Sequence, residues 1–91
     1  IRGARQPRPG ERAYRLGGSS CLAGDFLGDY AFERPLQVGD RLIFEDMMHY
    51  TLVKTTMFNG VPHPAIGFLR SDGQFELWRE FDYADYRRRM G

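Results

Sequence analysis

Residues 65–79 read Ala65-Ile-Gly-Phe-Leu-Arg-Ser-Asp-Gly-Gln-Phe-Glu-Leu-Trp-Arg79. Two runs rich in apolar residues, 65–69 and 74–79, lie on either side of Ser71-Asp-Gly73. A short connection that contains glycine between two such runs is typical of a β-hairpin. This stretch therefore predicts antiparallel β structure, and it is the most clearly defined local unit of the chain.

Three segments upstream of this hairpin, residues 13–16, 26–32 and 40–45, also have the composition of strands. Phe26, Tyr30 and Phe32 occur at even spacing, which places them on one face of a strand. Leu42 and Phe44 do the same in the third segment, which has the clearest strand pattern of the three. Because glycine and proline separate these runs, the sequence predicts a mainly β domain.

Two further segments have helical features. Residues 45–60 leave two interpretations open, because their Thr and Val content favours a strand while Tyr50, Val53 and Met57 lie near a helical spacing. Residues 82–89 begin with an acidic residue and end with arginines, which suits the dipole of a short helix. We therefore expect a short helix at the C-terminal end.

The length and composition point to one small globular domain. The chain has 91 residues, of which 42% are hydrophobic and 27% charged, with a net charge of +1. This balance excludes collagen, coiled coil and disorder, and the length is too short for two domains. No apolar run approaches the roughly 18 to 20 residues that cross a bilayer, and no leader is visible. With Cys21 as the single cysteine, no internal disulfide can form, and we expect a cytoplasmic protein.

Arginines are concentrated in the first fifteen residues, where Glu11 is the only acidic residue. Residues 1–12 have no apolar periodicity, so we interpret them as a basic linker or arm and residues 13–91 as the β-domain. A basic arm can also bind nucleic acid. Together with the aromatic residues, it leaves open an alternative, a nucleic-acid-binding β-barrel module.

Candidate chemistry centres on Cys21, in a loop rich in glycine and serine where a thiol is accessible. A lone cysteine is more often a small core residue, and pairing with His49 as in thiol hydrolases is a third hypothesis. Glu45, Asp46 and His49 are too few to support a metal site, and we expect none. Tyr50 is of interest as a site residue if its segment is buried, because a buried phenol requires a hydrogen-bond partner and a phosphate oxygen is a good one; from the residues alone, we expect a core residue.

Three motifs taken together resemble one enzyme family. They are Ser20-Cys-Leu-Ala-Gly-Asp-Phe-Leu-Gly-Asp-Tyr30, then Val38-Gly-Asp-Arg-Leu-Ile-Phe-Glu-Asp46, then His49-Tyr-Thr with Thr56-Met-Phe-Asn-Gly60. In this order they are similar to the C-terminal domain of carboxynorspermidine (carboxyspermidine) decarboxylases. These belong to the fold type III, alanine-racemase-like decarboxylases that use pyridoxal 5'-phosphate. The resemblance runs from about Tyr14 to the end of the chain.

The resemblance implies a C-terminal β-barrel or sandwich domain with a short C-terminal helix. The family's (β/α)8 barrel domain, which carries the Schiff-base lysine, is absent from this chain. Partners would be that N-terminal barrel and a second subunit, in a homodimer with shared active sites. The implied reaction converts carboxynorspermidine or carboxyspermidine to norspermidine or spermidine and CO2.

The resemblance also implies roles for individual residues. Cys21 matches the catalytic proton donor, Tyr50 the tyrosine that contacts the cofactor phosphate, and Asp25 a residue that shapes the site or meets a substrate ammonium. Two departures stand out. Leu22 occupies the position after the cysteine where many relatives have an acidic residue, and Met48-His49 replaces their Gly-Ala before the tyrosine. Both variants resemble the branch of the family that acts on long carboxylated polyamines.

Overall fold

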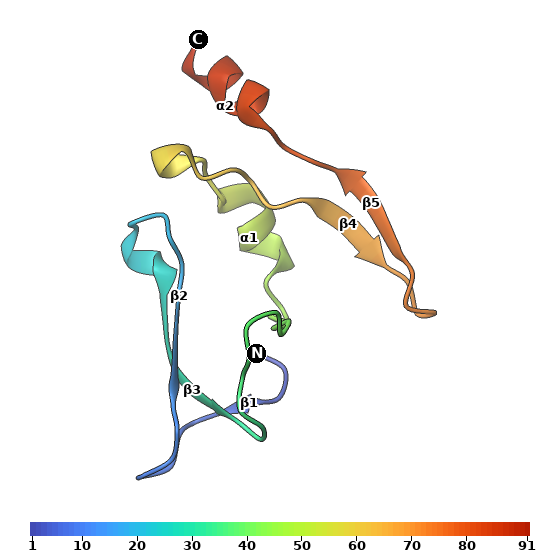
Figure 1. The fold of residues 1–91 in the computed structure, drawn as a ribbon. Helices are drawn as coiled ribbons and strands as arrows, with labels where there is room; N and C mark the ends of the chain where they lie inside the picture. Colours follow the sequence, from blue (N-terminus) through green and yellow to red (C-terminus); the bar gives the residue numbers. More distant parts are fainter. The chain divides into compact units, whose positions relative to one another are not determined.

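The computed structural model describes residues 1–91, which form two compact units, Ile1–Val53 and Lys54–Gly91. The strands and the two α-helices of the chain are labelled in Figure 1. Neither α-helix is long and apolar enough to cross a membrane.

The first unit contains a three-stranded antiparallel sheet. Its strands are β1 (Ala4–Arg5), β2 (Tyr14–Gly17) and β3 (Phe26–Phe32), and β3 lies between the other two (Figure 1). Residue 14 pairs with residue 30, and a bulge interrupts the register between Leu16 and Gly17. Ala31 in the central strand is the one fully buried residue. Strands β2 and β3 confirm two of the predicted segments.

The predicted strand at residues 40–45 is wrong. This segment contains no strand residues, although the carbonyl of Ile43 accepts a 2.9 Å hydrogen bond from the backbone N–H of Arg2. Alternating Leu42 and Phe44 favour an extended backbone, but a strand forms only where a neighbour supplies a ladder of such bonds. The alternation alone therefore did not identify a paired strand.

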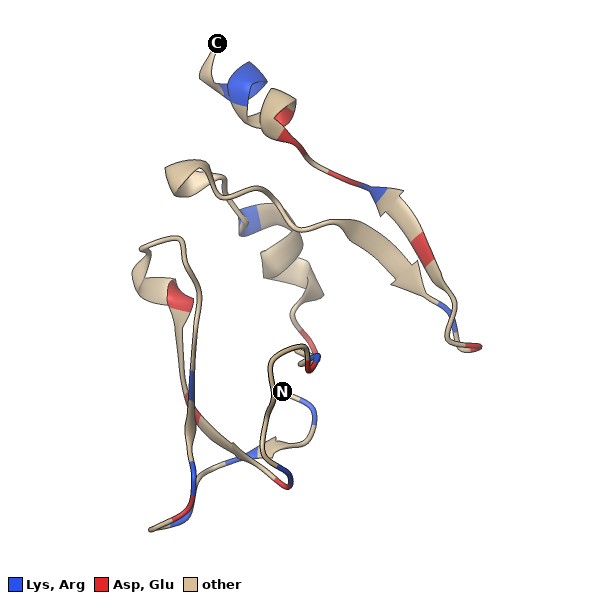
Figure 2. Ribbon diagram, viewed as in Figure 1, with Lys and Arg blue, Asp and Glu red and all other residues tan.

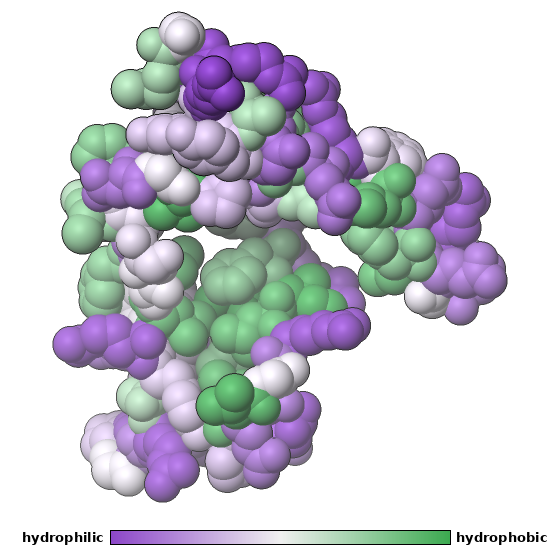
Figure 3. Space-filling model, turned by 45° about the horizontal axis from the view of Figure 1, so that its top comes forward, coloured by the Kyte–Doolittle hydropathy of each residue, from purple (hydrophilic) through white to green (hydrophobic).

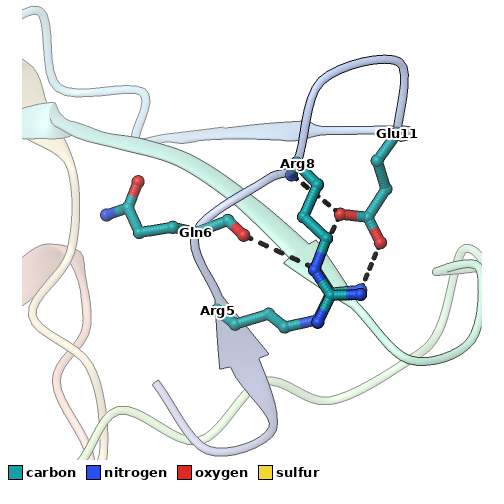
Figure 4. Close-up of polar contacts among 4 residues, drawn as sticks. All are labelled: Arg5, Gln6, Arg8 and Glu11. Carbon is teal, nitrogen blue, oxygen red and sulfur yellow. Dashed lines mark hydrogen bonds and ion pairs between the residues drawn. The ribbon is translucent and has the colours of Figure 1, made fainter.

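The N-terminal segment, interpreted from sequence as a linker or arm, supplies the edge strand β1. Ala4 pairs with Phe32 and Arg5 with Ala31. Figure 4 shows how the following turn is closed: both terminal nitrogens of Arg5 bond the carboxylate of Glu11, which also accepts the backbone N–H of Arg8 at 3.0 Å. The domain boundary at residue 13 stays a prediction, but residues before it take part in the sheet.

Residues 45–60 contain helix rather than strand. Helix α1 spans Met48–Lys54, and a 3-10 turn, η2, spans Phe58–Gly60. A second 3-10 turn, η1, spans Ala23–Asp25 between β2 and β3. The sequence left a strand and a helix open for this segment, and the helical spacing of residues 50 and 53 predicted the element that forms.

The second unit contains the hairpin and the terminal helix, and both predictions are confirmed. Strands β4 (Ile66–Leu69) and β5 (Phe75–Arg79) pair antiparallel, and the rings of Phe68 and Trp78 stack with centroids 5.8 Å apart. Helix α2 spans Tyr83–Met90, and Asp82 caps its start by accepting the backbone N–H of Ala84 at 2.8 Å. Because β4 and β5 are adjacent in sequence, local patterning was sufficient to predict them.

Large apolar side chains remain exposed in both units. Figure 3 shows apolar residues on the visible surface, and Phe26, Val53 and Trp78 are exposed to 60%, 76% and 62%. Exposure of so many large apolar side chains is uncommon on a free-standing domain and is typical of surfaces that contact another protein segment or a ligand. The chain by itself therefore lacks most of the core that its composition could form.

Candidate active site

The loop between β2 and β3 carries the predicted proton donor. Gly17 pairs with Phe26, so residues 18–25 form a loop closed by the two strands. Cys21 lies on this loop, is exposed, and has φ of +66°, in the left-handed region. An L-residue with a side chain rarely adopts this conformation without support from its surroundings. The loop thus holds its one thiol at an accessible and strained position.

Asp25 is hydrogen-bonded to the loop at three points. Its carboxylate oxygen Oδ1 accepts the hydroxyl of Ser20 at 2.6 Å. Its backbone N–H donates to the carbonyl of Leu22 at 3.0 Å, and its own carbonyl accepts the N–H of Gly18 at 2.9 Å. These contacts flank Cys21 on both sides, so the structure brings Cys21 and Asp25 together in one loop.

The charge of Asp25 is also stabilised by the loop. The hydrogen bond from Ser20 lowers the pKa of the Asp25 carboxyl below its ordinary value of 3.8, and weaker interactions with the backbone of Ser20, Leu22 and Cys21 act in the same direction. Partial burial opposes them by penalising the charged form. Because its pKa is lowered, the Asp25 carboxyl is ionised at neutral pH and accepts hydrogen bonds from the groups around it.

Gly18 provides the space for this carboxylate. A Cβ atom at residue 18 would lie 3.1 Å from Cγ and 3.2 Å from Oδ1 of Asp25, closer than ordinary contact. Neither Gly18 nor Ser20 was predicted from the sequence as a site residue. Both residues belong to the Gly17-Gly-Ser-Ser20 run directly before the cysteine. From the sequence alone, this run indicated only that the preceding strand ends.

Tyr50 lies on a different element, helix α1, and its side chain is 75% exposed. The sequence argument for Tyr50 depended on burial, so that argument does not apply. An exposed phenol can nevertheless donate a hydrogen bond to an anion that approaches the helix. His49 is its neighbour on α1 and also lies on a different element from Cys21.

Several acidic and basic residues outside the loop form ion pairs with one another. No group of three or more His, Cys, Asp and Glu side chains comes together as metal ligands would. The carboxylate of Glu45 instead accepts from Arg2 at 2.7 Å. Arg15 pairs with Asp29 at 2.8 Å and Arg5 with Glu11. Figure 2 shows how basic and acidic residues are distributed along the ribbon. The ion pairs of Arg2, Arg5 and Arg15 leave less unpaired positive charge in the N-terminal arm for binding a nucleic acid.

Comparisons with known proteins identify the family. The family described as "Pyridoxal-dependent decarboxylase, C-terminal sheet domain" matches residues 2–48. Carboxyaminopropylagmatine decarboxylase of Synechocystis is 77% identical over 91 residues, which are 100% of this chain and 24% of that protein. Carboxynorspermidine/carboxyspermidine decarboxylase of Campylobacter jejuni is 47% identical over 76 residues, which are 84% of this chain and 20% of that protein.

A solved structure shows the same fold. The crystal structure of carboxynorspermidine decarboxylase from Campylobacter jejuni, complexed with norspermidine, matches with a TM-score of 0.82 and 39% identity. The match covers 97% of this chain and 27% of that one. The chain thus spans about a quarter of the length of the relatives that it matches. It belongs to the family of pyridoxal-dependent decarboxylases and corresponds to their C-terminal sheet domain.

Proposed function

We propose that this chain is the C-terminal part of a lyase that uses pyridoxal 5'-phosphate to decarboxylate a carboxylated polyamine. The observation that carries the proposal is the 77% identity over all 91 residues with a decarboxylase of such a compound. Two further relatives, 47% and 48% identical, are named for carboxynorspermidine and carboxyspermidine. The product would be the corresponding polyamine and CO2, as in polyamine biosynthesis.

Two kinds of substrate fit this class: carboxynorspermidine or carboxyspermidine, and carboxyaminopropylagmatine. The motifs in the sequence resemble enzymes that act on carboxynorspermidine and carboxyspermidine, and the solved relative was crystallised with norspermidine. The higher identity with the Synechocystis protein favours carboxyaminopropylagmatine, which ends in a guanidinium group. Leu22 leaves the position after the cysteine without a carboxylate. Other residues must therefore meet the far cationic end of either substrate.

The residues of this chain are compatible with the cofactor in two respects. Tyr50 is exposed and its phenol hydroxyl can donate to a phosphate oxygen, and the exposed thiol of Cys21 can deliver a proton. When bound, pyridoxal phosphate takes up the electron pair left on the substrate carbon after CO2 departs. Cys21 would then protonate that carbon. Lys54 is the only lysine of the chain, and we propose that the Schiff-base lysine comes from the N-terminal barrel domain.

The exposed apolar surface supports the two macromolecular partners. Leu22 and Phe26 flank the 3-10 turn at residues 23–25 of the loop, and they are 45% and 60% exposed. We propose that the N-terminal (β/α)8 barrel and the second subunit of a fold type III homodimer cover such surfaces and place Cys21 in a shared active site. A cytoplasmic location fits a substrate of this class and remains part of the proposal.

The experiment is a decarboxylation assay with the complete enzyme. We expect CO2 release from carboxyaminopropylagmatine and from carboxynorspermidine, with the larger kcat/KM for the former, and no release without pyridoxal phosphate. Mass spectrometry of the products distinguishes the two reactions. No decarboxylation of any carboxylated polyamine by the cofactor-loaded enzyme would refute the proposed function, whereas salt-sensitive oligonucleotide binding would support the nucleic-acid alternative.

A further inference from the structure

We infer that Asp25 is a positioning residue whose carboxylate, held by Ser20, fixes the loop that presents Cys21, and that it does not bind the substrate. This inference rests on the proposed function, in which Cys21 is the proton donor. It assigns Asp25 a different role from the substrate contact suggested by sequence, and it adds Ser20 and Gly18 to the residues on which proton delivery depends.

The first argument is the distribution of hydrogen bonds. The carboxylate of Asp25 bonds the residue before Cys21, and the backbone N–H of Asp25 bonds the carbonyl of the residue after it. A third bond joins the Asp25 carbonyl to Gly18 at the start of the loop. Residue 25 is therefore tied to residues 18, 20 and 22, and Cys21 is the residue enclosed between these attachments.

The second argument is the backbone conformation of Cys21. Its φ of +66° is strained for any residue with a Cβ, and such a conformation persists only where surrounding contacts impose it. Cys21 is exposed, so packing around its own side chain does not impose it. The hydrogen bonds of Asp25 with residues 18, 20 and 22 are contacts that hold the loop on both sides of Cys21. They fix the direction in which the thiol leaves the backbone, which is what proton delivery to one carbon requires.

The third argument concerns the accessibility of the carboxylate. Oδ1 already accepts the Ser20 hydroxyl, and Gly18 lies so close that a Cβ there would contact Oδ1 at 3.2 Å. Oδ2 is buried and has no hydrogen-bond partner. A substrate ammonium could reach Oδ2 only by displacing part of the loop, and Oδ1 is already engaged by Ser20. The carboxylate is therefore directed toward the loop.

The test compares Asp25→Ala, Asp25→Asn and Ser20→Ala in the complete, cofactor-loaded enzyme. The matched control is Asp29→Asn, because Asp29 lies on β3, directly after the loop, and its carboxylate pairs with Arg15 instead of with the loop. Three quantities are measured: kcat, KM, and the fraction of turnovers that end in misplaced protonation, detected as the amine form of the cofactor and an aldehyde product.

We expect Asp25→Ala and Ser20→Ala to lower kcat about tenfold or more and to raise the misprotonated fraction, with KM changed less than threefold. Asp25→Asn keeps an oxygen that can accept from Ser20, so it should restore part of the kcat lost in Asp25→Ala. Hydrogen exchange of the amides of residues 18–25 should accelerate in Asp25→Ala and Ser20→Ala, and the control should match the unmodified enzyme in every quantity.

The contrary result is equally defined. If Asp25 binds the substrate, Asp25→Asn fails as severely as Asp25→Ala, KM rises at least tenfold, the products stay normal and Ser20→Ala is nearly silent. That pattern overturns the inference and leaves the proposed function standing. If Cys21→Ala itself gives normal products at the normal rate, the proton-donor assignment fails, while unchanged exchange in residues 18–25 would separately refute the positioning role.

Discussion

The two loops that join antiparallel strands in this chain use left-handed backbone in different ways. In the β4–β5 loop, the residue with positive φ is Gly73, at +87°, and glycine adopts that conformation at no steric cost. In the β2–β3 loop, it is Cys21, which must be held there by its neighbours. One loop is built for a stable turn, and the other places strain on a chemically reactive residue.

The supporting contacts differ accordingly. The β4–β5 turn is closed by local bonds from Arg70 to Gln74 and from Gly73 to Arg70, at 2.8 and 2.9 Å. The β2–β3 loop uses a partly buried carboxylate as an internal acceptor. Backbone strain with dedicated polar support is a feature of functional sites. The comparison therefore indicates which of the two loops carries function, independently of sequence similarity.

The largest expected effect is that of Cys21→Ala in the complete enzyme. General acid catalysis contributes about 100- to 10,000-fold, so turnover should fall within that range and part of the product should become misprotonated. Measurements of CO2, polyamine and aldehyde yields check this. The parallel change in the other loop, Ser71→Ala, should leave all three yields unchanged. A normal yield of polyamine from Cys21→Ala would make the strain at residue 21 purely structural.

The second prediction extends the comparison from loops to helices. Tyr50→Phe on α1 should weaken binding of pyridoxal phosphate by about 0.5 to 3 kcal/mol, the range for one hydrogen bond to a neutral or charged acceptor. Tyr83 on α2 is the matched control, because it is exposed to 74% where Tyr50 is exposed to 75%. Titration of the cofactor into the two variant apoenzymes measures the difference. Equal affinities would remove Tyr50 from the cofactor site.

Sequence patterns predicted the parts of this chain whose contacts are local. The β4–β5 hairpin and the cap of α2 by Asp82 depend on residues within fifteen positions of each other. The predicted strand at 40–45 failed because pairing depends on a partner that alternation cannot identify. The support of Cys21 was missed for a related reason: serine and glycine before a cysteine indicate a turn, and only the folded backbone shows that Asp25 accepts from Ser20.

The third prediction tests the cost of left-handed backbone in the β4–β5 turn. Gly73→Ala should destabilise the hairpin by about 1 to 2 kcal/mol, because φ at residue 73 is positive and only backbone strain is added. Hydrogen exchange of the β4–β5 amides should accelerate about tenfold. Gly24→Ala is the control, since a Cβ there also meets nothing within 4 Å but φ is not positive. Exchange that is equally fast in both variants would contradict this account of strain.

The smallest expected effect is a pH dependence that distinguishes the N-terminal turn, closed by Glu11, from the β2–β3 and β4–β5 loops. The hydrogen bonds from Arg5 and from the backbone of Arg8 lower the pKa of Glu11 from 4.5 to about 2. Because the pKa is lower in the folded chain, the stabilisation is complete above pH 4.5 and is lost as the pH falls through about 2.

NMR of carboxyl-labelled glutamate in the complete protein should show Glu11 titrating near that lower value. In Arg5→Ala, the pKa of Glu11 should move back toward its ordinary value, while the hydrogen exchange of residues 18–25 stays unchanged. If Glu11 titrates at its ordinary value in the unmodified protein, the Arg5–Glu11 ion pair does not hold β1 and its turn. Asp25 would then be the one carboxylate of the two that stabilises its surrounding loop.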